Sequence, residues 1–225
     1  MTSEKKIEDV KDDSNVARIF WTGGFDSTAL LIRLLKQKKK VIPIYIKHSR
    51  NSGWMKGERE DRARTEIRKQ LRSSWKKYLD KEVIWDHDQF SMNYNYNLLF
   101  EAYVELCNAV GIGEQYAVLR ALRDWVGYEG SKIQMAIVMF DQLWWNLRSI
   151  GSDVAGWKFF KDFEFPMWYE EKITIWKKSS KYEKSLLNLT FSCEIEKGNK
   201  TCIERGLSFG KRCKPCQGRL DIISK

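Results

Sequence analysis

Proline and histidine are scarce in this sequence, and long apolar runs are missing. The 225 residues include 3 prolines, 2 histidines and 14 glycines, which excludes collagen-like and proline-rich linker architectures. No apolar run approaches the roughly 18–20 residues that a membrane-spanning helix needs. The first 15 residues are rich in Lys, Asp and Glu and contain no apolar stretch, unlike a secretory signal peptide. We therefore expect a cytoplasmic protein that does not use a membrane.

Positive charge is present in excess. The chain carries 40 Lys and Arg against 30 Asp and Glu, a formal charge of +10, with 43% hydrophobic and 13% aromatic residues. This composition is too apolar for a disordered chain and predicts a packed core. The charge favours anionic partners such as nucleotides or nucleic acid, although a cationic surface without a specific ligand explains it equally well. We expect a polar leader over residues 1–15, one domain over 16–188 and a distinct segment over 189–225.

The first part of that domain is typical of an α/β fold with a parallel sheet. Val16–Trp21 is a short apolar run that predicts a strand, a helical stripe follows from Asp26, and Val41–Ile46 predicts a second strand. A strand–helix–strand unit of this length places its two strands in parallel. Further along we predict a helix over 58–78, a strand over 82–85 and helices over 97–110 and 114–126. Residues 132–140 predict a central strand, with a helix as the alternative, and residues 141–180 predict a mostly helical part with an extended segment over 163–168.

The junction between the first strand and helix predicts an anion-binding loop. Residues 20–31 read FWTGGFDSTALL, in which two glycines let backbone N–H groups approach a ligand closely. The start of a helix attracts phosphate through free N–H groups and the helix dipole. No lysine follows the glycines as in a Walker A loop, and the spacing of a dinucleotide fingerprint is absent. The alternative is a tight turn with an ordinary helix cap.

This loop resembles the S-G-G-x-D-S motif of the PP-loop ATP pyrophosphatases, with Thr22 in place of the first serine. The resemblance implies a three-layer, Rossmann-like fold of the adenine nucleotide alpha hydrolase type that splits ATP between its α and β phosphates. The implied ATP-binding residues are Thr22, Gly23, Gly24, Phe25, Asp26, Ser27 and Thr28, with Tyr45 beside the adenine. Asp26 and Ser27 would take part in catalysis, and a carboxylate beside phosphates implies a bridging Mg²⁺.

Four cysteines lie close together near the end of the sequence. Cys193, Cys202, Cys213 and Cys216 fall within 24 residues, the last two as a C-x-x-C pair, which suits a tetrahedral Zn²⁺ site. A redox C-x-x-C and unrelated free thiols are the alternatives. Cys107 lies far from them in the sequence, and we interpret it as a small buried hydrophobic residue.

Together the loop and the cysteines resemble one PP-loop family, the 7-cyano-7-deazaguanine synthases. The matching segments are TFSC at 190–193, KPCQGRL at 214–220, FPM at 165–167 and EKI at 171–173. The resemblance implies a ligase that adenylates 7-carboxy-7-deazaguanine and then uses ammonia to form the nitrile, with Lys172 as a catalytic cation. The chain departs from the family pattern in its wider cysteine spacing and in lacking the Y-G-Q-R-H and Y-P-D-C segments, and these departures bear most on the acceptor.

Two other functions therefore stay open. The first keeps the ATP chemistry and changes the acceptor to tRNA or a protein terminus. The second is a nucleic-acid-binding zinc module on a scaffold that no longer turns over. We interpret the charged segment 57–81 as a solvated helix face in preference to a nucleic-acid surface, and the many aromatics as residues of the core and of a homodimer interface.

Overall fold

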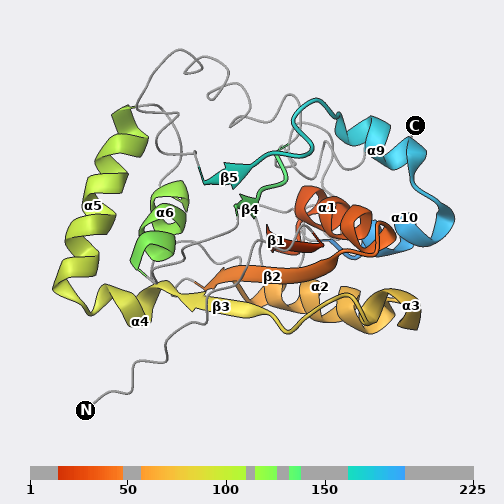
Figure 1. The fold of residues 1–225 in the computed structure, drawn as a ribbon, viewed down its shortest axis with the longest axis horizontal. Coiled ribbons are helices and arrows are strands. Elements are labelled where there is room, and N and C mark those ends of the chain that lie inside the picture. Colours follow the sequence, from red (N-terminus) through yellow and green to blue (C-terminus); the bar gives the residue numbers. More distant parts are fainter. Residues whose placement is uncertain (1–14, 48–56, 110–114, 126–131, 138–161, 191–225) are drawn as a thin grey trace, which may run out of the picture.

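The structure, a computed structural model, describes residues 15–47, 57–109, 115–125, 132–137 and 162–190. Its centre is a five-stranded parallel sheet with the order β3-β2-β1-β4-β5 (Figure 1). The strands are β1 (Val16–Phe20), β2 (Lys40–Lys47), β3 (Val83–Asp86), β4 (Ile133–Gln134) and β5 (Phe163–Glu164). This strand order is that of a doubly wound, Rossmann-like sheet, so the predicted parallel α/β class is confirmed.

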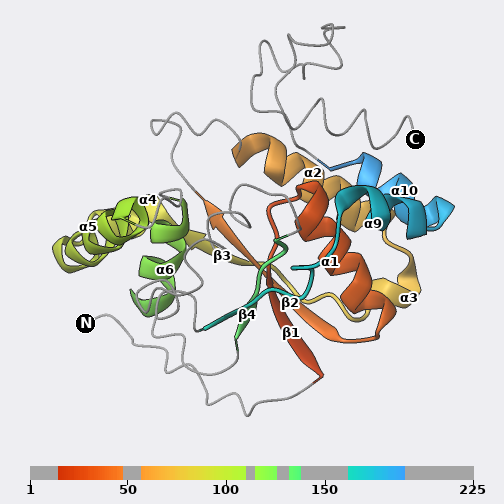
Figure 2. The same cartoon turned by 90° about the horizontal axis from the view of Figure 1, so that it is seen from above.

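Helices cover both faces of the sheet and complete three layers (Figure 2). One layer contains α1 (Phe25–Lys36), α2 (Gly57–Gln70), α3 (Ser73–Lys76), α9 (Lys172–Lys178) and α10 (Lys181–Asn188). The other contains α4 (His87–Ser91), α5 (Tyr94–Ala109) and α6 (Gln115–Trp125). Among the described residues no helix is long and apolar enough to cross a membrane.

Each face of the sheet has its own hydrophobic core because successive strand residues point to opposite sides. Ile19 of β1 is fully buried among α1, α2 and α10, whereas Phe20 packs on the opposite side with the α5–α6 pair. Burial on both faces explains why the residues of β1 are apolar apart from Arg18, as in the central strands of parallel sheets.

The single helix predicted over residues 58–78 is wrong, because the chain breaks between α2 and α3. Tyr182 of α10 satisfies the backbone at the break: its hydroxyl donates to the carbonyl of Gln70 at 3.0 Å and accepts from the amide of Arg72 at 2.7 Å. Leu71 is buried at this point. A contact from 110 positions away in the chain thus replaces the helical hydrogen bonds that a regular helix would have made.

The central strand predicted over residues 132–140 is shorter than expected where the structure describes it. β4 includes only Ile133 and Gln134, and the amide of Met135 still donates to Glu164 of β5 at 2.8 Å. The amide of Ile137 then donates to the carbonyl of Met135 at 3.1 Å. This local bond turns the chain away from the strand ladder, and residues 138–140 lie outside the described part.

Helix α10 begins with a capping box whose acid also makes an ion pair. Glu183 accepts from the amide of Ser180 at 2.8 Å, and Ser180 accepts from the amide of Glu183 at 3.3 Å. Lys36 Nζ of α1 lies 2.7 Å from the Glu183 carboxylate, whose side chain is 7% exposed. Burial raises the pKa of Glu183, but the bonds from Lys36 and Ser180 outweigh burial and the net pKa is lowered.

Glu183→Gln is expected to lower the free energy of unfolding by about 1 kcal/mol at pH 7, a typical value for a lost cap. Because the pKa of Glu183 is lower in the folded state, the charged form stabilises the fold above the unfolded-state pKa, and this contribution disappears as the pH falls through the folded-state pKa. Urea unfolding at pH 7 and pH 3.5 measures the difference. A gap between variant and parent that is the same at both pH values would contradict this role.

Candidate functional site

The glycine loop occupies the edge of the sheet where ligands bind in doubly wound folds. Residues 21–24 follow the carboxyl end of β1, and β1 lies between β2 and β4, where the strand order changes direction. Parallel sheets of this kind bind ligands in the crevice outside the carboxyl ends of the strands at this switch point. The predicted loop therefore lies at the position where the fold provides a binding site.

Gly23 is required by the backbone and by its surroundings. Its φ is +80°, a left-handed conformation that side chains rarely adopt. A Cβ at this position would lie 3.0 Å from the carbonyl oxygen of Glu60, 3.1 Å from Arg64 Cγ and 3.2 Å from Ala63 Cβ. The loop thus passes directly over the first half of α2, and only a glycine permits that approach.

Hydroxyl groups brace the loop at the start of α1. The Thr22 Oγ1 atom accepts from the amide of Gly24 at 3.2 Å and lies 3.2 Å from Ser27 Oγ, which donates to the carbonyl of Gly24 at 3.3 Å. The N-cap of α1 is Gly24, which contributes no side-chain cap. The ordinary side-chain cap of the alternative interpretation is therefore not present, and the positive end of the α1 dipole faces the loop.

Two of the predicted loop residues, Phe25 and Thr28, pack in the core. Thr28 is fully buried, and its hydroxyl accepts a hydrogen bond from the indole N–H of Trp21 at 3.1 Å. Trp21 is also fully buried, and Phe25 packs half-buried against the same core. These contacts fix the loop to the body of the domain, whereas Thr22 is exposed beside the start of the helix.

The structure brings Asp26 and Lys172 together. Lys172 is the first residue of α9 and lies 146 positions after Asp26 in the sequence. Its Nζ is 3.0 Å from Asp26 Oδ2, and the two side chains are 38% and 20% exposed. An acid and a cation that sequence patterns assigned separately thus meet in the first turn of α1.

The segment before α9 is attached along α1 by a second ion pair. Arg33 on α1 donates to Glu170 at 2.5 Å and to the carbonyl of Pro166 at 3.4 Å. These bonds hold residues 166–170 against the side of α1, about two helix turns beyond Asp26. Arg33 and Glu170 therefore position the chain that delivers Lys172 to the loop.

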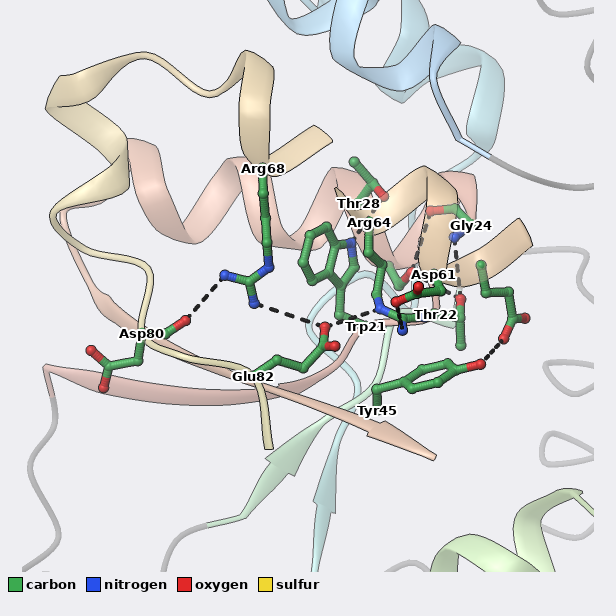
Figure 3. Close-up of polar contacts among 12 residues, drawn as sticks. Trp21, Thr22, Gly24, Thr28, Tyr45, Asp61, Arg64, Arg68, Asp80 and Glu82 are labelled. Carbon is green, nitrogen blue, oxygen red and sulfur yellow. Dashed lines mark hydrogen bonds and ion pairs between the residues drawn. The ribbon is translucent and has the colours of Figure 1, made fainter. Parts of the chain in front are cut away.

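Tyr45 and Arg64 form a layer beneath the loop, as Figure 3 shows. The Arg64 guanidinium lies 3.3 Å from the centre of the Tyr45 ring, and the Tyr45 hydroxyl donates to Glu60 at 3.0 Å. Burial and the neighbouring Glu60 carboxylate raise the pKa of Tyr45, so the hydroxyl stays protonated at neutral pH. Because Tyr45 is 5% exposed, stacking of adenine on its Arg64-covered face would require Arg64 to move.

Arg64 is the main residue that sequence reasoning missed at this site. It is 2% exposed and donates to Glu82 at 3.0 Å and to Asp61 at 3.2 Å (Figure 3). In the sequence, Arg64 is one of many charged residues in the segment 57–81, so its charge alone does not distinguish it. Ala63, Ile67 and Leu71, at a spacing of four residues, are nevertheless buried. That stripe marks the inward face of α2, and Arg64 lies next to it.

The remaining predicted site residues fall outside the described part of the chain. Cys193, Cys202, Cys213 and Cys216 all belong to residues 191–225, so the zinc site stays a prediction. Cys107 is fully buried in the hydrophobic core, as predicted. Within the described ranges there is no group of three or more His, Cys, Asp or Glu residues that could hold a metal ion.

Comparison with known proteins leaves family and activity open. No protein-family model matches the chain, and no curated protein matches it. Among solved structures, the chain is 14% identical to a predicted subunit of tRNA methyltransferase from Methanocaldococcus jannaschii, over 89% of this chain and 94% of that one, with a TM-score of 0.39. The fold assignment therefore depends on strand order and helix layers, and not on this similarity.

Proposed function

We propose that this protein is an ATP-dependent ligase that adenylates a carboxylate at the glycine loop. The observation that carries the proposal is the Asp26–Lys172 ion pair at the first turn of α1, 3.0 Å between the charged atoms. Each residue was predicted from a separate motif of the same family resemblance, and their charged atoms are in contact. The loop itself has the glycine conformation and the uncapped helix start that phosphate binding needs.

In this proposal the residues of the loop have distinct roles. Backbone N–H groups at Gly23 and the start of α1 bind phosphate oxygens, with the exposed Thr22 hydroxyl and the nearby Ser27 as further donors. Lys172 offsets the negative charge that builds up when carboxylate and triphosphate approach each other, which is the main electrostatic obstacle to the reaction. The carboxylate oxygen attacks the α-phosphorus, and pyrophosphate leaves.

The residues present fit a Mg²⁺ that arrives with ATP. Mg²⁺ in such sites is held by one or two carboxylates together with substrate phosphates, and keeps several waters. Asp26 supplies one partly exposed carboxylate beside the loop. It would change partner from Lys172 to the metal, which would leave Lys172 free to move to the phosphates or the acceptor.

For the acceptor we propose 7-carboxy-7-deazaguanine. Ammonia would displace AMP from the acyl-adenylate to give the amide, and a second adenylation of the amide oxygen, followed by loss of AMP and a proton, would give the nitrile. The overall balance is two ATP consumed and two AMP and two pyrophosphate released. The cysteines at 193, 202, 213 and 216 are proposed to bind one structural Zn²⁺.

The experiment that tests the proposal identifies the nucleotide products. The full chain is incubated with ATP, Mg²⁺, ammonia and 7-carboxy-7-deazaguanine, and the products are separated by mass spectrometry. We expect acceptor-dependent AMP and pyrophosphate in a ratio of one to one, with the nitrile formed from the acid. Release of ADP and phosphate would overturn the ATP chemistry, whereas AMP formation with tRNA and not with the free base would overturn only the acceptor.

A further inference from the structure

Among the residues that the structure describes, positive charge is concentrated at one end. We define the basic end as residues 36–40, 69–81 and 177–188, which hold the C-terminus of α1, the end of α2 with α3, and the end of α9 with α10. These residues include 13 Lys and Arg against 2 Asp and Glu, whereas the rest of the described residues hold 11 against 15. The described part of the chain is thus strongly cationic at this end and weakly anionic elsewhere.

The three segments form one continuous surface. In Figures 1 and 2 α3, α10 and the end of α1 lie on the same side of the molecule. Trp75 and Tyr182 pack with ring centres 5.5 Å apart, and the Arg72 guanidinium lies over both rings. Lys36 of α1 contacts Glu183 of α10. Side chains from all three segments therefore meet, and their charges act together.

Both acids of the basic end are already paired within it. Glu183 lies 2.7 Å from Lys36, and Asp80 lies 3.2 Å from Lys40. The cations with exposed side chains and no carboxylate within ion-pair distance among the described residues include Lys38, Arg72, Lys76, Lys77, Lys177, Lys178 and Lys181. So many uncompensated charges on one compact surface repel one another and favour a polyanion.

The side chains on this surface indicate which kind of partner it binds. A protein interface has an apolar centre, and a membrane-binding helix presents exposed apolar side chains beside its cations. The large exposed hydrophobic residues of the described chain are Val83, Ile84, Met92, Tyr94, Leu98 and Tyr169, and all of them lie outside the basic end. A surface of lysines and arginines without exposed large hydrophobic side chains suits a sugar–phosphate backbone, which is recognised mainly by charge.

We infer that the basic end binds the backbone of a nucleic acid. α1 connects it to the glycine loop, since the loop precedes the first turn of this helix and the basic end includes its last. Twelve helical residues extend about 18 Å, so a bound strand can reach from one end of α1 to the other. The interpretation of residues 57–81 as a plain solvated face then applies to α2 alone and not to the turn and α3.

The test measures binding without ATP, so that it is independent of the proposed ligase activity. Fluorescence anisotropy is recorded with a labelled tRNA transcript, a 30-base-pair DNA duplex and a 30-nucleotide single strand, each at several salt concentrations. The variant Lys77→Ala/Lys178→Ala/Lys181→Ala removes three exposed charges of the basic end. The control Lys47→Ala/Arg62→Ala/Lys132→Ala removes three exposed cations elsewhere, of which Lys47 is ion-paired with Asp86.

We expect the basic-end variant to bind at least tenfold more weakly and to lose about 2–3 from the slope of log affinity against log salt, about one for each phosphate contact. The control variant should change affinity less than threefold, and Asp26→Asn should bind as the parent does. Equal weakening in both triple variants, no binding to any of the nucleic acids, or binding only to phosphatidylserine vesicles would overturn the inference. The preferred probe distinguishes RNA from DNA.

Discussion

Asp26→Asn is expected to lower acceptor-dependent AMP formation by about 100-fold or more, the size of effect seen when a preorganised electrostatic group is removed from an active site. Asparagine keeps the shape of the side chain and loses the charge that pairs with Lys172 at 3.0 Å and that would hold Mg²⁺. The rate of pyrophosphate release at saturating ATP measures the loss. Glu101→Gln, the same chemical change at an exposed position on α5, should leave the rate unchanged.

Lys172→Ala provides the second half of the same argument. We expect it to lower the rate by at least tenfold, whereas Lys178→Ala, an exposed lysine on the same helix, should have no effect on turnover. Because the two charges act on one site, the double variant should lose much less than the product of the single losses. Turnover that survives Asp26→Asn in a folded protein would remove the loop from the catalytic mechanism.

Arg64→Ala is expected to lower the free energy of unfolding by about 3 kcal/mol, the cost of removing one partner from a buried ion pair. Arg64 is 2% exposed, donates to Glu82 and covers the Tyr45 ring at 3.3 Å. Its removal leaves the Glu82 carboxylate, 14% exposed, without this donor and opens a cavity under Gly23. Arg62→Ala, two positions away and exposed, should change stability by less than about 0.5 kcal/mol.

Denaturant unfolding followed by circular dichroism measures both variants. Arg64→Lys tests the geometry, because lysine restores the charge but not the planar guanidinium that stacks on the ring and donates to two acids. We expect it to recover at most half of the loss. Equal stability of Arg64→Ala and Arg62→Ala would show that the layer beneath the loop does not hold the fold together.

Much of the central architecture could be predicted from local patterns. β1, α1 and β2 fall where apolar runs and the helical stripe placed them, because a central parallel strand is buried on both faces and a covering helix on one. The double glycine at the first strand–helix junction indicated a phosphate loop for the same local reason. In the structure, Gly23 has a φ of +80° and approaches Glu60 closely, which is why this position needs a glycine.

Other features depended on partners that lie far away in the chain. The break between α2 and α3 depends on the hydrogen bonds of the Tyr182 hydroxyl, and the sequence around Leu71 did not predict it. The burial of Arg64 follows from its position between the Gly23 loop, Tyr45 and Glu82, all of which lie 18 or more positions away in the sequence. Spacing along one segment cannot reveal such contacts, because the groups that decide them belong to other elements.

The sequence by itself therefore determined the parallel α/β class and the position of the glycine loop, since each depends on periodicity or on backbone freedom within a few residues. Only the tertiary structure decided that Lys172 meets Asp26, that Arg64 supports the loop, and that lysines from three segments form one basic end. Those arrangements arise from packing helices on a sheet, which brings together charges that lie up to 146 positions apart.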